Sequence, residues 1–186
     1  MKTLTLACLL LVCAAVQAQD YDYSNKVKIG GGYAHDFPGL NGYSVFAEYS
    51  RPLSYQLQGS IGVKLNNMSG YPRTATVQEY TKSNSIDFNI YYVPLSTPAG
   101  ELRIGAGYSF SFYNTRRSYP VITDHAAGDI TTWRRQDKKG RVSGVSLTGE
   151  YEYFIPETNY SFGVRASLFK AYDKVSFAGI FGAINF

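Results

Sequence analysis

The sequence predicts an all-β protein, built as one eight-stranded antiparallel up-and-down transmembrane β-barrel. The first observation is composition, because 18 Gly, 17 Tyr and 11 Phe among 186 residues suit strands better than helices. The second is hydropathy that alternates residue by residue in segments of about ten residues. The third is that no stretch after residue 18 reaches the ~20 consecutive apolar residues of a membrane helix. Any membrane crossing would therefore use strands.

The first four expected strands carry apolar side chains at every second position. Gly, Pro, Asn, Asp and Ser cluster at their ends, which is typical of turns. The strands and their apolar faces are 26–34 with Val27, Ile29 and Tyr33; 43–50 with Tyr43, Val45 and Tyr49; 56–66 with Leu57, Ile61, Val63 and Leu65; and 85–93 with Ile86, Phe88, Ile90 and Tyr92.

The last four expected strands follow the same pattern. The final strand is apolar on both faces, so its parity is assigned from Phe186, with Asn185 opposite, and this parity needs a three-residue loop or a bulge near Asp173. The strands and faces are 101–113 with Leu102, Ile104, Ala106, Tyr108, Phe110 and Phe112; 141–153 with Val145, Leu147, Tyr151 and Tyr153; 160–172 with Phe162, Val164, Ala166 and Leu168; and 176–186 with Ile180, Ile184 and Phe186.

Residues 1–18 are predicted to be a signal peptide. Lys2 gives a positive start, the segment from Leu4 to Val16 is almost wholly apolar, and small residues precede a cleavage site after Ala18. Both cysteines lie inside this leader, so the mature chain is expected to contain neither a disulfide nor a reactive thiol. Residues 19–25 would form a short periplasmic segment before the barrel at 26–186.

The connections between expected strands alternate in length. The turns at 51–55, 94–100 and 154–159 are short, whereas 67–84 and 114–140 are long. Short periplasmic turns and longer external loops are typical of outer-membrane barrels. The alternation therefore places both chain ends on the periplasmic side.

Seven charged residues lie on the polar faces of the first seven expected strands, with alternating sign. Unpaired charge is costly in an enclosed lumen, so each acid is expected to pair with bases on neighbouring strands, Arg103 pairing with Asp87 and also with Glu150. The alternatives are ordinary pairing on a solvated sheet and a soluble lipocalin-like ligand-binding barrel with its apolar face inward. The lumen charge ring consists of Lys28, Glu48, Lys64, Asp87, Arg103, Glu150 and Arg165.

The C-terminal residues Ile184 and Phe186 resemble the terminal signal of outer-membrane barrels, an aromatic residue preceded two places earlier by an apolar one. Phe181 stands where a glycine is usual, with Gly179 and Gly182 nearby. With its leader, the chain resembles small porin-family barrels of the Bacteroidota type and, more distantly, the OmpA/OmpX type. The resemblance implies export to the bacterial outer membrane, contact with its lipid, and recognition of the last strand by the barrel-assembly machinery.

Catalytic chemistry has little support in the sequence. Lipid A deacylases with this fold carry a His-x-Ser pair on one strand, and neither His35 nor His125 begins such a pair. His35 beside Asp36 leaves a lipid A-modifying acyl enzyme as an alternative. No His and carboxylate cluster has metal-ligand spacing, so neither a metal nor another cofactor is expected.

The connection 114–140 has a basic character, with six cations against Asp124, Asp129 and Asp137. Such residues bind phosphates, including those of lipopolysaccharide, or an acidic surface partner. The chain's mild net charge of +4 argues against nucleic acid. We therefore expect a non-enzymatic protein with a structural or surface-binding role through 67–84 and 114–140. The cations are Arg116, Arg117, Arg134, Arg135, Lys138 and Lys139.

Overall fold

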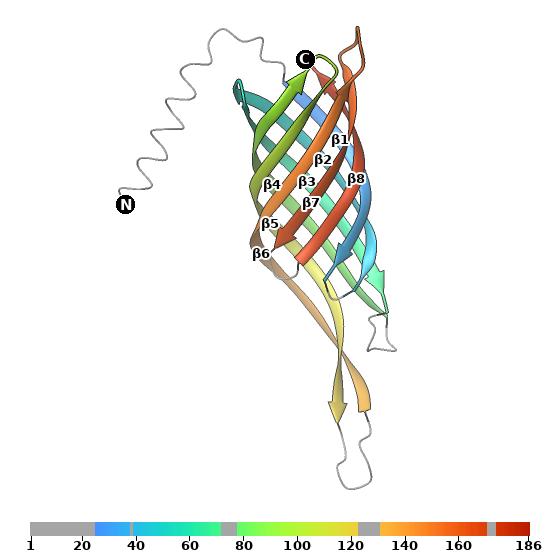
Figure 1. The fold of residues 1–186 in the computed structure, drawn as a ribbon. Coiled ribbons are helices and arrows are strands. Elements are labelled where there is room, and N and C mark those ends of the chain that lie inside the picture. Colours follow the sequence, from blue (N-terminus) through green and yellow to red (C-terminus); the bar gives the residue numbers. More distant parts are fainter. Residues whose placement is uncertain (1–24, 38, 72–77, 123–130, 171–173) are drawn as a thin grey trace, which may run out of the picture.

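Eight strands form one closed barrel in the computed structural model (Figure 1). The structure describes residues 25–37, 39–71, 78–122, 131–170 and 174–186, and only the backbone of 120–122 and 131–133. Each strand pairs antiparallel with its sequence neighbours, and β1 pairs with β8, which confirms the eight-stranded up-and-down barrel. The strands are β1 (Lys26–Asp36), β2 (Asn41–Ser54), β3 (Leu57–Gly70), β4 (Glu79–Thr97), β5 (Gly100–Ile122), β6 (Thr131–Phe154), β7 (Tyr160–Lys170) and β8 (Lys174–Asn185).

Three short connections lie at one end of the barrel, as the sequence predicts. Residues 55–56 join β2 to β3, 98–99 join β4 to β5, and 155–159 join β6 to β7. Asn25 and Phe186 meet at this terminus end, drawn at the top of Figure 1, where their backbones exchange hydrogen bonds of 2.8 and 2.9 Å. These bonds extend the β1–β8 pairing to the last residue.

The two connections predicted as long loops are largely strand, so that prediction is wrong. The β3–β4 ladder continues to the pair Gly70 and Glu79, and the β5–β6 ladder continues to Ile122 and Thr131. Apolar alternation ends where the outer wall becomes polar, whereas backbone pairing continues between polar side chains. The extended β5–β6 hairpin projects far beyond the other strands, at the end opposite the terminus end (Figure 1).

Apolar side chains cover the outside of the barrel. Ile29, Val164 and Ile180 are 67%, 55% and 70% exposed. Lys28 and Arg103 are fully buried inside. A soluble lipocalin-like barrel has the opposite sidedness, so that alternative is wrong.

Strand β8 has the parity that the sequence predicts. Ile180, Ile184 and Phe186 are exposed on the outer wall, and Phe181 is buried in the lumen. The β7–β8 connection has the three residues 171–173, which lie outside the described residues. The expected leader 1–18 and residues 19–24 also lie outside them. In the described part of the chain, no helix is long and apolar enough to cross a membrane.

A small aromatic cluster shares the lumen with the polar residues. Phe46 of β2 and Phe177 of β8 pack edge to face, with ring centroids 5.9 Å apart, and Phe181 is buried beside them. Gly30 of β1 leaves room for the cluster, because a Cβ atom there would lie 2.7 Å from Phe46 Cζ and from Phe181 Cβ. Gly30 is thus required by close packing.

Candidate functional site

An ion-pair cluster fills the middle of the lumen and contains five residues of the predicted charge ring. Lys28 Nζ lies 3.2 Å from Glu48 Oε1 and 2.9 Å from Glu150 Oε2. Arg165 lies 3.0 Å from Glu48 and also contacts Glu150. Arg103 Nε lies 3.4 Å from Glu150 Oε2. The register accounts for these contacts, because Lys28 faces Glu48, and both arginines face Glu150 from adjacent strands.

A second layer of charge lies between this cluster and the terminus end, and the sequence analysis did not include it in the ring. Lys26 Nζ lies 3.3 Å from Glu101 Oε2 and 3.6 Å from Glu152 Oε1. Gln58 Nε2 donates to Glu101 Oε2 at 3.3 Å. Arg103 joins the two layers, because it contacts Glu152 and donates to Gln58 Oε1 at 3.2 Å.

Strand parity could have identified this second layer. Lys26 precedes Lys28 by two residues, and Glu152 follows Glu150 by two, so each pair shares the inward face of its strand. Together the two layers hold four cations and four carboxylates. Such balance limits the cost of removing the charges from water. The cations are Lys26, Lys28, Arg103 and Arg165, and the carboxylates are Glu48, Glu101, Glu150 and Glu152.

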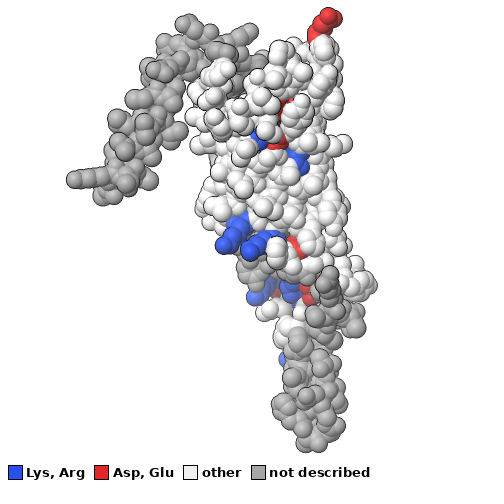
Figure 2. Space-filling model, in the orientation of Figure 1, with Lys and Arg blue, Asp and Glu red and all other residues white. Residues whose placement is uncertain are grey.

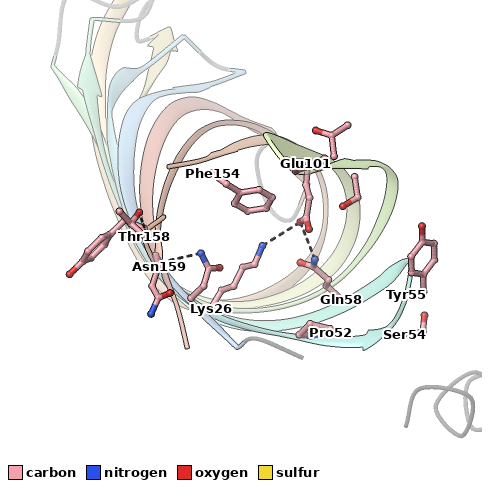
Figure 3. A pocket seen from close by; sticks show the side chains of 14 residues that line it. Lys26, Pro52, Ser54, Tyr55, Gln58, Glu101, Phe154, Thr158 and Asn159 are labelled. Carbon is pink, nitrogen blue, oxygen red and sulfur yellow. Dashed lines mark hydrogen bonds and ion pairs between the residues drawn. The ribbon is translucent and has the colours of Figure 1, made fainter. Parts of the chain in front are cut away.

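A cavity of about 660 Å³ opens at the terminus end and stops at the second layer. In Figure 3, Lys26, Gln58 and Glu101 form its floor, joined by dashed contacts, and Phe154 points into the same space. The Phe154 ring centroid lies 4.8 Å from Lys26 Nζ. The polar groups of the floor residues are already paired with one another. The cavity is therefore a vestibule that leads to a lumen filled by side chains.

Lys64 and Asp87, the other two members of the predicted ring, form a separate ion pair of 2.9 Å. The expected contact between Asp87 and Arg103 is wrong. The β4–β5 register places Ser109 opposite Asp87, and Arg103 lies six residues away, about 20 Å along the strand. Alternating sign along the sequence therefore does not produce a simple neighbour-to-neighbour ring.

Arg117, predicted as one of the anion-binding cations, is instead bound to acids at the mouth of the barrel opposite the terminus end. It donates to Asp36 Oδ2 at 2.9 Å and to Glu79 Oε2 at 3.3 Å. Both acids are buried. The backbone N–H of Ser118 donates to Glu79 Oε1 at 2.8 Å. These bonds tie the base of the projecting hairpin to β1 and β4.

Arg116 is also engaged by an acid. Its guanidinium donates to both carboxylate oxygens of Asp137, at 2.7 and 2.8 Å, from the facing position on β6. This bidentate hydrogen bonding holds the pKa of the Asp137 carboxyl below its ordinary value and raises the pKa of Arg116. The other four predicted anion-binding cations have exposed side chains on the same hairpin, and the charges of two of them, Arg135 and Lys139, also lower the pKa of Asp137; the four are Arg134, Arg135, Lys138 and Lys139.

Aromatic side chains form two bands on the outer wall. The residues of both bands are exposed. Tyr and Phe at such heights are typical of membrane interfaces. The band at the terminus end contains Tyr49, Tyr92, Tyr151, Tyr153 and Tyr160, and the external band contains Tyr33, Tyr43, Tyr108, Phe110 and Phe112.

His35 lies at the external end of β1, and His125 lies outside the described residues. The His35 ring pairs through Nδ1 with Asn41 Oδ1 at 2.7 Å. The register places Ser176 of β8 opposite His35, a proximity that the sequence analysis missed. The Ser176 hydroxyl donates to the His35 backbone carbonyl at 3.3 Å, so its observed hydrogen bond does not join it to the imidazole.

Comparison with known proteins gives structural similarity without sequence similarity. No protein-family model matches the chain, and no curated protein matches it. A major outer membrane protein of Thermus thermophilus has a TM-score of 0.61 at 13% identity, over 89% of this chain and 100% of that one.

Two further solved structures resemble the chain over most of its length. Neisserial surface protein A (NspA) has a TM-score of 0.57 at 12% identity, over 88% of this chain and 97% of that one. Ail of Yersinia pestis, in complex with the heparin analogue sucrose octasulfate, has a TM-score of 0.51 at 9% identity, with the same coverage. The chain therefore has the fold of small outer-membrane β-barrels.

Proposed function

We propose that the chain is a non-enzymatic protein of the bacterial outer membrane whose β5–β6 hairpin binds anionic polysaccharide outside the cell. The observation that carries this proposal is the projecting hairpin with its exposed cations. The apolar wall between two aromatic bands supports the membrane location, as does the fold shared with outer-membrane proteins. The leader rests on the sequence pattern of residues 1–18, and the Bacteroidota porin-family assignment rests on the sequence resemblance.

The hairpin presents its cations beyond the rest of the barrel wall. β7 ends opposite Val145, so the part of β6 from Thr131 to Gly144 extends up to roughly 45 Å without a β7 partner. Arg134, Arg135 and the neighbouring lysines are exposed there. Cations spaced along a strand suit a ligand with repeated negative charge better than a single small anion. Sulfated and phosphorylated polysaccharides have this chemistry, and the Ail complex contains a polysulfated sugar.

Removal of the hairpin cations is expected to weaken binding of sucrose octasulfate. R134Q/R135Q and K138Q/K139Q should together raise the Kd about tenfold or more, because each exposed charge contact contributes ~0.2–1 kcal/mol. Titration calorimetry of the detergent-solubilised chain at several salt concentrations measures this, and screening should weaken wild-type binding.

The matched control is K170Q/K174Q, which removes two exposed lysines from the outer wall at the same end. We expect it to bind sucrose octasulfate as the wild type does. Binding that is unchanged in the hairpin variants, or reduced equally in the control, would contradict the proposed hairpin site.

The absence of catalysis is tested on lipid A, the substrate of the alternative acyl enzyme. Acyl transfer needs a base, an activated nucleophile or acceptor, and oxyanion donors in one place. His35 and Ser176 are adjacent, yet their observed hydrogen bonds go to Asn41 and to the backbone. Mass spectrometry of lipid A is expected to show the same acylation with wild type, with His35→Ala and without the protein. A change that needs His35 would identify an enzyme.

A further inference from the structure

A groove of about 430 Å³ indents the outer wall at the external end of β6, β7 and β8. Its lining is mainly apolar, with Val145 and Leu147 from β6, Leu168 from β7, and Phe37 from the β1–β2 connection. These four side chains are all exposed on the outer wall. The volume lies in the range of small-molecule sites. Because β6 continues beyond the end of β7, its extension forms a step beside the groove.

Lys170 and Lys174 form the polar edge of this groove. They face one another across the β7–β8 pair, and both are exposed. Within the residues that the structure describes, neither lysine forms an ion pair with an acid. The connection between them contains a single acid, Asp173. Like charges directly opposite on a sheet repel one another, and a bound anion between the two ammonium groups would remove that repulsion.

The position of the groove relative to the membrane agrees with a lipid headgroup at this edge. Figure 2 shows Lys and Arg, with some Asp and Glu beside them, in the lower part of the barrel, next to a broad wall that is mostly uncharged. The external aromatic band as defined above has its members on β1, β2 and β5, and on β6, β7 and β8 the outward positions near it hold Arg141 and the two lysines. Lys174 is held at the edge, since its carbonyl accepts from Phe37 N at 2.9 Å and its Nζ lies 5.0 Å from the Phe37 ring centroid.

We propose that this groove binds a phosphorylated glycolipid of the outer leaflet, with a phosphate between Lys170 and Lys174 and an acyl chain on Val145, Leu147 and Leu168. The inference goes beyond polysaccharide binding, because it uses different residues and requires an acyl chain. The lysine pair selects an anionic headgroup, and the apolar lining selects a hydrocarbon chain. A soluble acidic polymer carries no acyl chain for the apolar lining.

Native mass spectrometry of the full chain, released from neutral detergent, tests the proposal with lipid A that carries two phosphates. We expect the wild type to retain this lipid A more strongly than dephosphorylated lipid A or phosphatidylethanolamine. K170Q/K174Q should raise the apparent Kd for lipid A roughly tenfold. Val145→Phe, which fills the groove and keeps both lysines, should also weaken retention. Heat-modifiable gel mobility verifies that each variant is folded.

One control separates the groove from general charge. R51Q/K82Q makes the same change in net charge at two exposed side chains away from the groove, Arg51 of β2 and Lys82 of β4, whose Nζ lies 6.0 Å from the Tyr80 ring centroid. This variant should retain lipid A as the wild type does. Equal retention of dephosphorylated lipid A, or unchanged retention in K170Q/K174Q or in Val145→Phe, would overturn the proposal. So would a loss of sucrose octasulfate binding in K170Q/K174Q without a loss of lipid A.

Discussion

Replacing Glu150 by Gln is expected to destabilise the barrel by about 3–5 kcal/mol, the usual cost of breaking a buried ion pair from one side. Glu150 lies against three buried cations, Lys28 at 2.9 Å, Arg103 at 3.4 Å, and Arg165. The amide keeps the shape of the carboxylate and removes its charge. Three cations would then share Glu48, Glu101 and Glu152 in a lumen from which water is largely excluded.

Urea unfolding in one detergent, followed by gel mobility and circular dichroism, measures the effect of Glu150→Gln. Asp137→Asn is the matched control, because the same acid-to-amide change is made in an exposed pair with Arg116. We expect its unfolding midpoint to equal that of the wild type. Equal midpoints for Glu150→Gln and Asp137→Asn would contradict this prediction. They would show that water in the lumen solvates the three cations without the Glu150 charge.

The barrel itself was predictable because the outer wall constrains the sequence at every second residue. In the fifth expected strand, Leu102, Ile104 and Tyr108 alternate with residues that face the lumen, and the structure places all three outside. A shift of one residue would turn every apolar side chain inward. The alternation therefore determines the number of strands and which side chains of each strand face outward.

The strand ends were not predictable from the same pattern. From Asn114 to Ser118 of β5 the side chains are polar on both faces, so hydropathy alternation carries no information there. The ladder continues because pairs such as Thr81 with Thr115, which share a hydrogen bond of 3.0 Å, stabilise it. Arg116 and Asp137 could be recognised as partners only once the β5–β6 register was known.

The composition of the lumen was predictable in part. Parity showed that Lys28, Glu150 and Arg165 point inward, but pairing also depends on height along the barrel, which the turn lengths set. Asp87 was assigned to Arg103 from alternating sign on neighbouring strands, without regard to height, and the register places Ser109 opposite Asp87 instead. The layer around Lys26 was missed because the ring took one charged residue from each strand, although parity also places Lys26 and Glu152 inward.

Replacing Gly32 by Ala is expected to destabilise the barrel by about 3 kcal/mol or more, at the upper end of the cost of overpacking. Gly32 and Gly179 face one another across the β1–β8 pair. A Cβ on Gly32 would overlap the Ala178 carbonyl oxygen and the Gly179 Cα. These are backbone atoms, so the overlap can be relieved only by separating the first and last strands.

The neighbouring glycine gives a close comparison for Gly32→Ala. A Cβ on Gly31 would lie 3.1 Å from the Ser44 carbonyl oxygen and 3.2 Å from Val45 Cγ1, so a shift of a few tenths of an ångström suffices and the urea midpoint should fall only slightly. Gly149→Ala, with no atom within 4 Å of the added Cβ, should leave it unchanged. If Gly32→Ala unfolds at the same urea concentration as Gly149→Ala, β1 and β8 do not approach as closely as the two glycines allow, and closure of the barrel does not depend on them.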